Sequence, residues 1–394
     1  MQELPAIMLV GPRATGKTTT AMRHAETLIR LDRPAEAAAF RADPDVALRD
    51  LPEPVALDEW QEVPELLGAV KRAVDVDPRP GRFLLTGSVR ADLVAQTWPG
   101  TGRVTRLPLL GMTVGEQIGT PTSGGLIDQL IAGDVPTVPS DPPDLRGYLE
   151  LALKSGFPEP ALGLSPDTGR AWLRGYVDQL VTRDAELIET VRDPSRLRRY
   201  LEAYATTSAG IVDEKTLADA AGLNRKTASA YERLLANLFI VDGLPAWSSN
   251  RLKRLRRSQK RYVIDAGLLA GILHLDVASV LRDGDVMGRV IDTFVVSHLR
   301  TEVETSAVHP RLFHLRTEQG RHEVDVIAEF AGGRVVAIEI KASASPTVGD
   351  ARHIAWLKDQ LGERFVGGAV LHTGHRAFPL GDRIVAAPIC SLWG

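Results

Sequence analysis

The sequence lacks several features that would assign it to particular protein classes. Its 394 residues include one cysteine, Cys390, which excludes an intrachain disulfide and a zinc site built from cysteines. No apolar run approaches the roughly 18 residues of a membrane-spanning helix. The first residues, MQELPAIMLVG, have neither the basic region nor the apolar length of a signal peptide. We therefore expect a cytoplasmic protein with no membrane partner.

A strong net charge is also absent. The formal charge of −3 argues against a chain that binds nucleic acid over its whole surface, so a nucleic-acid surface must be local. The apolar fraction of 44% and the charged fraction of 25% are those of a folded globular protein. The length predicts two or three domains.

A glycine-bounded loop lies between a short apolar strand and a helical pattern in AIMLVGPRATGKTTTAMRHAETLIR. Its spacing is that of a phosphate loop, G-x-x-x-x-G-K-[ST]. The N–H groups of such a loop surround phosphate oxygens, its lysine neutralises them, and its hydroxyl ligates Mg²⁺. The alternative is a glycine turn before an ordinary helix. The loop predicts that ATP and Mg²⁺ bind at Gly11, Pro12, Arg13, Ala14, Thr15, Gly16, Lys17, Thr18 and Thr19.

Two further strands end in polar residues. PVALDEW (54–60) places Asp58 and Glu59 after an apolar run, and RFLLTGS (82–88) ends with Thr86 and Ser88. We expect Asp58 to complete the Mg²⁺ site with Thr18, Glu59 to activate the attacking water, and Thr86 and Ser88 to contact the γ-phosphate. The strands would share a sheet edge, where ligands of open α/β sheets bind. A solvated acidic turn is the alternative for residues 58 and 59.

These motifs, with GTGRVTRLPLLGMTVGEQ, resemble a family of prokaryotic AAA-type ATPases whose C-terminal half is catalogued as domain of unknown function 4143. The similarity continues in KSGFPEP (154–160), YVDQLVTRDAE (176–186) and RYVIDAGLLAGIL (261–273), so it covers nearly the whole chain. It implies ATP hydrolysis. It also makes Arg103 and Arg183 candidates for an arginine finger, supplied in such proteins by a neighbouring subunit of a homo-oligomer. Either arginine could equally form a surface ion pair.

The middle of the chain has the pattern of a helix-turn-helix. After a Pro-, Gly- and Ser-rich connector (121–147) and helical periodicity over 168–205, Leu217 to Ala221 predict a short helix, Gly222 a turn, and Asn224 the cap of a second helix. A strand, LFIVDGLPAW, and the segment 251–265 would form a β-wing. Seven of the eleven residues from 251 to 261 are Lys or Arg. We predict DNA contacts at Lys226, Lys253, Arg254, Arg256 and Arg257. The alternative is a protein–protein adaptor.

The last third predicts a helix, three strands, a helix and a strand, an order that resembles the PD-(D/E)xK nuclease core. In VVAIEIKAS (335–343), Glu339 and Lys341 interrupt an apolar strand and lie on one of its faces. With Asp325 on the preceding strand, the resemblance implies a Mg²⁺ site at Asp325 and Glu339, with Lys341 orienting a water for cleavage. A Glu–Lys ion pair is the alternative. The family's leading proline is replaced by Val324, and its helical Glu by Asp292.

The sequence thus predicts an α/β multidomain protein in four parts: a P-loop AAA-type ATPase domain with a parallel sheet (1–120), a connector (121–147), a helical and winged helix-turn-helix domain (148–265) and a PD-(D/E)xK nuclease-like domain (266–394). The expected function is ATP hydrolysis coupled to DNA processing or defence. The alternative is a nucleotide-dependent switch, or a toxin–antitoxin-like DNA-binding regulator, without cleavage.

Overall fold

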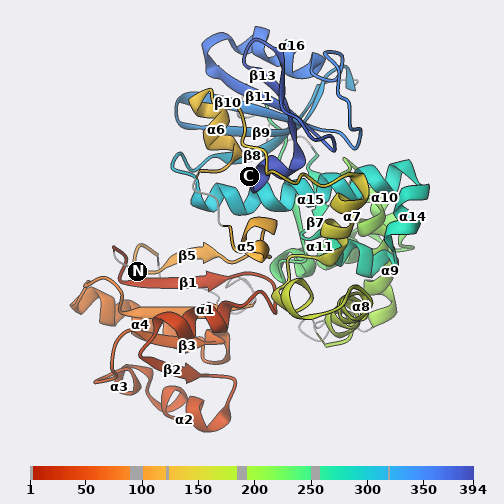
Figure 1. Cartoon of the computed structure of the whole chain (residues 1–394). Helices are drawn as coiled ribbons and strands as arrows, with labels where there is room; N and C mark the ends of the chain where they lie inside the picture. The colour runs from red at the N-terminus through yellow and green to blue at the C-terminus, as the bar shows by residue number, and fades with distance from the viewer. Residues whose placement is uncertain (1–2, 89–100, 121–123, 184–192, 250–257, 318–319) are drawn as a thin grey trace. The chain divides into compact units, whose positions relative to one another are not determined.

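The computed structural model describes residues 3–88, 101–120, 124–183, 193–249, 258–317 and 320–394 (Figure 1). The chain forms two compact units. The first comprises Met1–Leu110 and Arg233–Ile240, and the second comprises Gly111–Glu232 and Val241–Gly394. The four predicted parts are a finer division than these two units and stay a prediction.

A five-stranded parallel sheet forms the centre of the first unit, in the order β2-β3-β4-β1-β5. Strands β1, β3 and β4 are mostly apolar and are buried along their whole length. Because these three strands are neighbours and run parallel, their carboxyl ends meet at one edge of the sheet. The strands are β1 (Ala6–Val10), β2 (Thr27–Arg30), β3 (Val55–Asp58), β4 (Phe83–Gly87) and β5 (Thr105–Pro108).

The helices of this unit pack their apolar faces on the sheet. In α4, Leu66, Val70 and Val74 recur at a spacing of four residues, and all three are buried in the core with Leu57 and Leu85. The helical segments that lie wholly in this unit are α1 (Lys17–His24), α2 (Pro34–Ala42), α3 (Pro44–Ala47), the 3₁₀ turn η1 (Trp60–Glu62) and α4 (Leu66–Val76).

The first half of the second unit is mostly helical. Its elements are α5 (Val114–Ile118), α6 (Leu126–Ala132), α7 (Leu145–Lys154), the π-helical turn η3 (Glu159–Gly163), α8 (Pro166–Arg183), α9 (Pro194–Thr206), α10 (Glu214–Ala220), α11 (Arg225–Asn237), β6 (Val241–Leu244), β7 (Lys260–Val263), α13 (Ala266–Leu273) and α14 (Val277–Arg282). The last residues of α11 fall in the first unit. Strands β6 and β7 form an antiparallel hairpin.

The second half is built on a six-stranded sheet in the order β12-β13-β11-β10-β9-β8. Strands β8, β9 and β10 pair antiparallel, and β10 pairs parallel with β11. The elements are α15 (Gly284–Thr305), β8 (Arg311–Arg316), β9 (Glu323–Phe330), the turn η6 (Ala331–Gly333), β10 (Arg334–Ile340), α16 (Arg352–Leu361), the turn η7 (Gly362–Arg364), β11 (Phe365–His372), β12 (Phe378–Gly381), β13 (Ile384–Pro388) and the turn η8 (Ile389–Leu392). The predicted order of helix, three strands, helix and strand is confirmed, while β12 and β13 were not predicted.

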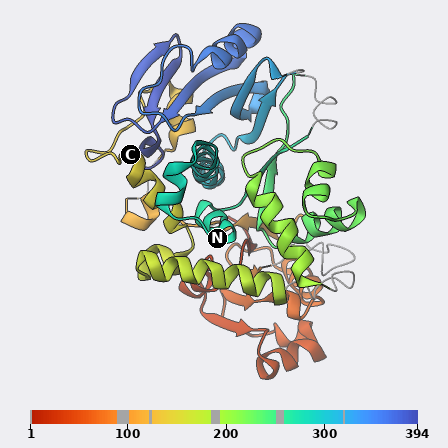
Figure 2. The same ribbon diagram turned by 90° about the vertical axis from the view of Figure 1, so that its right-hand side faces the viewer.

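Helices cover both faces of this sheet. A Cβ at Gly367 would lie 2.7 Å from the carbonyl oxygen of Leu130 in α6, and a Cβ at Gly368 would lie 2.6 Å from Ile354 in α16. Because neighbouring residues of a strand face opposite sides, α6 and α16 pack on opposite faces. Figure 2, which views α15 nearly along its axis, shows this helix beside the sheet. Residues 121–147 therefore contribute a helix to the fold, beyond the connector that their composition indicates.

Two of the looser sequence motifs meet at a buried carboxylate. Asp265, before α13, accepts hydrogen bonds from Ser155 Oγ (2.8 Å), Gly156 N (2.9 Å) and Leu268 N (2.7 Å). Ser155 has a φ of 79°, and a Cβ at Gly267 would lie 2.4 Å from its Cβ. The motifs KSGFPEP and RYVIDAGLLAGIL are thus parts of one packing contact.

None of the described helices combines the length and the apolar composition needed to cross a membrane.

Candidate functional site

The loop after β1 closes on itself ahead of α1. Thr15 Oγ1 donates to the carbonyl oxygen of Pro12 at 3.0 Å. Ala14 and Gly16 are left-handed, with φ of 60° and 89°. A Cβ at Gly11 would lie 2.2 Å from the carbonyl oxygen of Leu109, so only glycine fits there. The glycines of the motif therefore serve the curvature that a phosphate-binding loop requires.

Lys17 is buried at the start of α1 and lies against this loop. Its Nζ donates to the carbonyl oxygens of Gly11 (3.0 Å) and Pro12 (2.5 Å). Burial lowers the pKa of Lys17 to about 8, while the charges of Glu59 and Asp58 oppose this shift. The ammonium is thus desolvated among neutral carbonyl groups, and a bound anion would stabilise its charged form.

Asp58 joins the loop to two strands of the sheet. Its Oδ1 accepts a hydrogen bond from Thr18 Oγ1 at 2.8 Å and another from Thr86 Oγ1. Asp58 and Thr86 are both buried. The structure thus brings together three of the predicted residues, from α1, β3 and β4. Their hydroxyl and carboxylate oxygens are hard ligands of the kind Mg²⁺ prefers, so these residues fit the implied metal.

Glu59 follows β3 in a left-handed conformation, with a φ of 54°. Its N–H donates to Thr86 Oγ1 at 3.3 Å. Its carboxylate accepts hydrogen bonds from Gln61 Nε2 and, at 3.5 Å, from Ser88 Oγ. The sequence analysis missed Gln61, although it is two residues after Glu59 in the same motif. These contacts bring the predicted Glu59 and Ser88 to the same edge as Asp58.

The remaining predicted nucleotide-site residues are placed as follows. Pro12 is buried, Arg13 is half-buried, and Thr19 is exposed on α1. Arg103 forms an ion pair with Asp75 of α4, in which both side chains are partly exposed. Arg103 would therefore have to leave this ion pair to contact a phosphate. Arg183 is the last residue of α8, and the placement of its side chain lies outside the description.

The two helices predicted for the helix-turn-helix are present as α10 and α11. Gly222 in the turn has a φ of 65°, and Asn224 Oδ1 accepts from Thr227 N at 2.9 Å, which caps α11 as expected. Lys226 is exposed on the first turn of α11. The other predicted nucleic-acid residues, Lys253, Arg254, Arg256 and Arg257, lie outside the described residues.

The basic run is not one solvated patch, because its last two residues are buried. Lys260 and Arg261 on β7 are 6% and 7% exposed. Arg261 pairs with Glu232 at 3.2 Å and donates to the carbonyl oxygen of Val212. A bridge between Gly210 and Arg261 ties the hairpin to the segment before α10. These two cations therefore belong to the interior of the unit.

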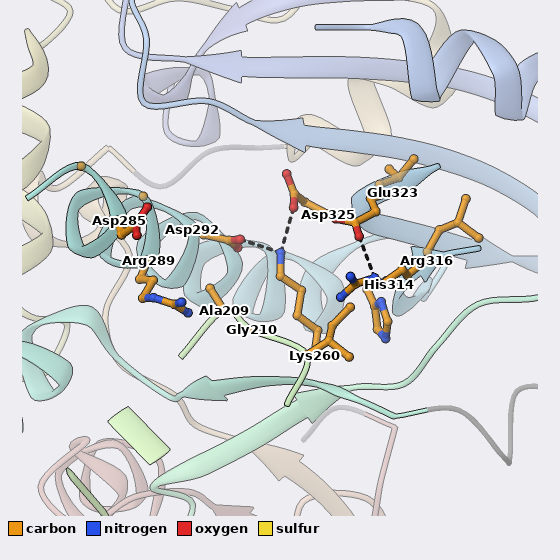
Figure 3. Close-up of a pocket in the computed structure, with 15 residues that line it drawn as sticks. Ala209, Gly210, Lys260, Asp285, Arg289, Asp292, His314, Arg316, Glu323 and Asp325 are labelled. Atoms are coloured by element: carbon orange, nitrogen blue, oxygen red, sulfur yellow. Dashed lines mark hydrogen bonds and ion pairs between the residues drawn. The ribbon is translucent and has the colours of Figure 1, made fainter. Parts of the chain in front are cut away.

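Lys260 lies between two carboxylates of the C-terminal fold. Its Nζ is 2.5 Å from Asp292 Oδ2 on α15 and 2.8 Å from Asp325 Oδ1 on β9 (Figure 3). Tyr262 Oη donates to Asp292 Oδ1 at 2.9 Å. Asp325 Oδ2 accepts from Ile340 N at 2.9 Å, just beyond the last β9–β10 pair. The sequence analysis placed Asp325 in a site but missed Lys260 and Tyr262.

Glu339 and Lys341 form an ion pair beside this cluster. Lys341 Nζ is 2.8 Å from Glu339 Oε1, and the lysine side chain is 34% exposed while that of the glutamate is 8% exposed. Burial, together with the charge of Asp325, raises the pKa of Glu339 to about 8. Burial and Asp325 thus act against ionisation of Glu339, whereas the ammonium of Lys341 favours it.

The charges of the cluster are coupled. Burial raises the pKa of Asp292 to about 6, against the opposing charge of Lys260. Burial also acts to raise the pKa of Asp325, but the charge and hydrogen bond of Lys260 outweigh it and lower that pKa. Burial acts to lower the pKa of Lys260, but Asp292 and Asp325 hold it well above its usual value.

These residues do not fit the predicted metal as they are arranged. The inner oxygens of Asp292 and Asp325 are taken by Lys260, and Glu339 is paired with Lys341. Across the described residues, no group of three or more His, Cys, Asp or Glu side chains is arranged to hold a metal ion. The two predicted metal ligands are thus each paired with a lysine, Asp325 with Lys260 and Glu339 with Lys341.

Comparison with known proteins agrees with this architecture. Residues 3–118 match the family described as AAA domain, residues 145–279 match domain of unknown function 8612, and residues 287–392 match domain of unknown function 4143. The first part of the chain is thus similar to AAA-type P-loop domains, and its last part is similar to domain of unknown function 4143, as the motifs indicated.

Two relatives are similar along almost the whole chain. They are uncharacterized proteins of Mycobacterium bovis and Mycobacterium tuberculosis, each 29% identical over 393 residues, which are 98% of this chain and 81% of each relative. A solved structure, the Walker-type ATPase of Pyrococcus abyssi, is 14% identical with a TM-score of 0.41, over 69% of this chain and 91% of that one.

Proposed function

We propose that the chain is a Mg²⁺-dependent ATPase, with its nucleotide on the loop from Gly11 to Thr18. The observation that carries this proposal is the hydrogen-bonded group of Thr18, Asp58 and Thr86, formed where β1, β3 and β4 end. Lys17 lies beside it, and its buried ammonium donates to the carbonyl oxygens of Gly11 and Pro12 and to no carboxylate of the described residues. A phosphate chain supplies the missing negative charge.

The residues divide the chemistry between them. The loop N–H groups and Lys17 hold the phosphates, and Thr18 and Asp58 would hold Mg²⁺. When bound, Mg²⁺ neutralises charge on the β- and γ-phosphate oxygens. Glu59 orients the attacking water and accepts its proton, while Thr86 and Ser88 contact the γ-phosphate. Gln61, which donates to Glu59, positions that carboxylate.

The test separates binding from turnover. Glu59→Gln preserves ATP binding but lowers turnover by a factor on the order of 10² or more, because only water activation is lost. Steady-state phosphate release and a nucleotide-binding titration measure the two effects. The matched control is Glu62→Gln, an exposed position on the same turn. Unchanged turnover in Glu59→Gln would refute the role of this carboxylate.

We propose further that full turnover needs an arginine from a neighbouring copy of the chain. Arg103 and Arg183 are the two candidates, and Arg103 must leave Asp75 to serve. Arg103→Ala and Arg183→Ala are each mixed with the Glu59→Gln protein. Recovery of activity in one of these mixtures identifies a finger acting between subunits, whereas no recovery in either excludes it.

We propose that the middle of the chain binds nucleic acid. A capped helix pair followed by a β-hairpin supports this, since it has the order of elements of a winged helix-turn-helix. Lys226 is exposed on α11, and the sequence adds Lys253, Arg254, Arg256 and Arg257 between the two strands. Replacing Arg254, Arg256 and Arg257 by Ala is expected to weaken DNA binding and to flatten its salt dependence, because fewer counterions are released. An unchanged salt slope would assign the module to protein contacts.

A second function is favoured by the lysine between the carboxylates. We propose that the C-terminal fold serves a nucleotide-dependent switch in DNA processing or defence and does not cleave DNA in the arrangement described. Cleavage by Asp325, Glu339 and Lys341 would require the carboxylates to be free of Lys260. Product gels from the ATPase reactions, run with Mg²⁺ and duplex DNA, decide between the two: fragments that disappear in Asp325→Ala would establish cleavage.

A further inference from the structure

Three elements bring the charged groups of the C-terminal cluster to one point. Asp292 comes from α15, Asp325 from β9 and Lys260 from β7, as the dashed contacts in Figure 3 show. The distances of 2.5 and 2.8 Å from Nζ to the two carboxylate oxygens are short, charge-assisted hydrogen bonds. A metal ion shared by these carboxylates would lie roughly 2.0–2.6 Å from each oxygen. The ammonium therefore occupies the space that such an ion needs.

Both lysines of the cluster are paired with carboxylates. Lys260 bonds to Asp292 and Asp325, and Lys341 bonds to Glu339. A divalent ion placed between Asp292 and Asp325 would lie against the ammonium of Lys260, and repulsion between two cations in a site largely shielded from water is costly.

The position of Lys260 is fixed by the hairpin. Lys260 pairs with Leu244 in the register of β6 and β7, and the next residue, Arg261, is bonded to Glu232 and to the carbonyl oxygen of Val212. The backbone of Lys260 is thus fixed by strand pairing, and its ammonium is held by two carboxylates.

The cluster is nevertheless open to small solutes. Lys260, Asp292 and Asp325 line a pocket of about 360 Å³ together with Arg289, His314 and Arg316. The side chain of Asp325 is 25% exposed. Metal ions in solution can therefore reach the carboxylates, so access does not limit metal binding here.

We infer that Lys260 takes the place of a divalent metal ion between Asp292 and Asp325, so that the C-terminal domain keeps its carboxylates together without binding metal. This inference rests on the proposed likeness of the domain to the PD-(D/E)xK core. It does not depend on ATP hydrolysis, whose site lies in the other unit.

The experiment measures Mn²⁺ binding to the full chain by calorimetric titration without nucleotide. Lys260→Met is expected to gain a Mn²⁺ site at least about tenfold tighter than any in the wild type. The double variant Lys260→Met, Asp325→Asn is expected to lose it. Lys260→Arg keeps a cation and is expected to gain no site. The matched control is Lys215→Met, which removes one exposed charge from α10.

Two results would overturn the inference. One is a Mn²⁺ site in the wild type that Asp325→Asn removes, a comparison that needs no change at Lys260 and so stands even if Lys260→Met does not fold. The other is a folded Lys260→Met protein with no added Mn²⁺ binding. Phosphate release measured in the same preparations reports on the proposed ATPase separately, so the two proposals can fail independently.

Discussion

Replacing Lys260 by Met is expected to destabilise the second unit strongly. The change removes a residue that bonds to both Asp292 and Asp325, and it leaves the buried carboxylate of Asp292 and the 25% exposed carboxylate of Asp325 without this cation. Breaking a buried ion pair by removal of one partner costs about 3–5 kcal/mol. For a unit of this size, that corresponds to a fall of roughly 5–9 °C in its melting temperature. Methionine retains much of the lysine's length and apolar volume, so the loss reports mainly on charge.

The stability lost in the Lys260→Met variant is expected to depend on pH. Without the ammonium, the pKa values of both carboxyls rise above their unfolded values, so the folded variant binds more protons than the unfolded chain. Stability of the variant is therefore present at low pH and lost as pH rises through the raised pKa values, by up to about 1.4 kcal/mol per pH unit for each proton. The gap between variant and wild type is thus larger at pH 8 than at pH 6.

Scanning calorimetry of the full chain at the two pH values measures this effect. Lys215→Met serves as the control for loss of one exposed lysine charge. Adding Asp292→Asn and Asp325→Asn to Lys260→Met removes both unpaired charges and is expected to recover much of the lost stability. If Lys260→Met has the same melting temperature as the Lys215→Met control at both pH values, Lys260 does not stabilise the unit through its charge.

Two further predictions concern other buried polar groups. Lys17→Ala is expected to weaken ATP binding at least about tenfold, since the charge beside the loop is lost. A titration with a fluorescent ATP analogue measures the affinity, and an affinity equal to that of the wild type would show that Lys17 does not bind the nucleotide. Asp265→Asn is expected to destabilise the second unit by about 1–3 kcal/mol, because an amide cannot accept hydrogen bonds from all three donors that contact the two carboxylate oxygens. Scanning calorimetry measures the change, and an unchanged melting temperature would show that these hydrogen bonds do not stabilise the unit.

Much of the nucleotide site could be predicted because its residues are local in the sequence. The loop from Gly11 to Thr18 is contiguous, and Asp58 and Thr86 each end an apolar run of a parallel sheet. Strands of this kind end at a common edge, so the sequence predicted that Thr18, Asp58 and Thr86 lie together. Gln61 was not predicted because its contact with Glu59 depends on the left-handed conformation of Glu59, which the residue types in this motif do not indicate.

The C-terminal cluster could be predicted only in part. Periodicity located β9 and β10 and therefore Asp325, Glu339 and Lys341. Lys260 was missed because it stands in a run of cations, where composition indicates a solvated surface. Its burial follows from long-range pairing: β7 joins β6, and 32 and 65 residues separate Lys260 from Asp292 and Asp325. No local pattern carries information about such contacts.

Two buried lysines, Lys17 and Lys260, show what distinguishes a binding group from a structural one. Lys17 donates to the neutral carbonyl oxygens of Gly11 and Pro12, and burial lowers its pKa to about 8. Lys260 is bonded to two carboxylates, which hold its pKa well above the usual value despite burial. An anion that reaches Lys17 relieves an unfavourable desolvation, whereas an anion at Lys260 would have to displace an existing ion pair. The same side chain is therefore suited to bind phosphate in one unit and to neutralise carboxylates in the other.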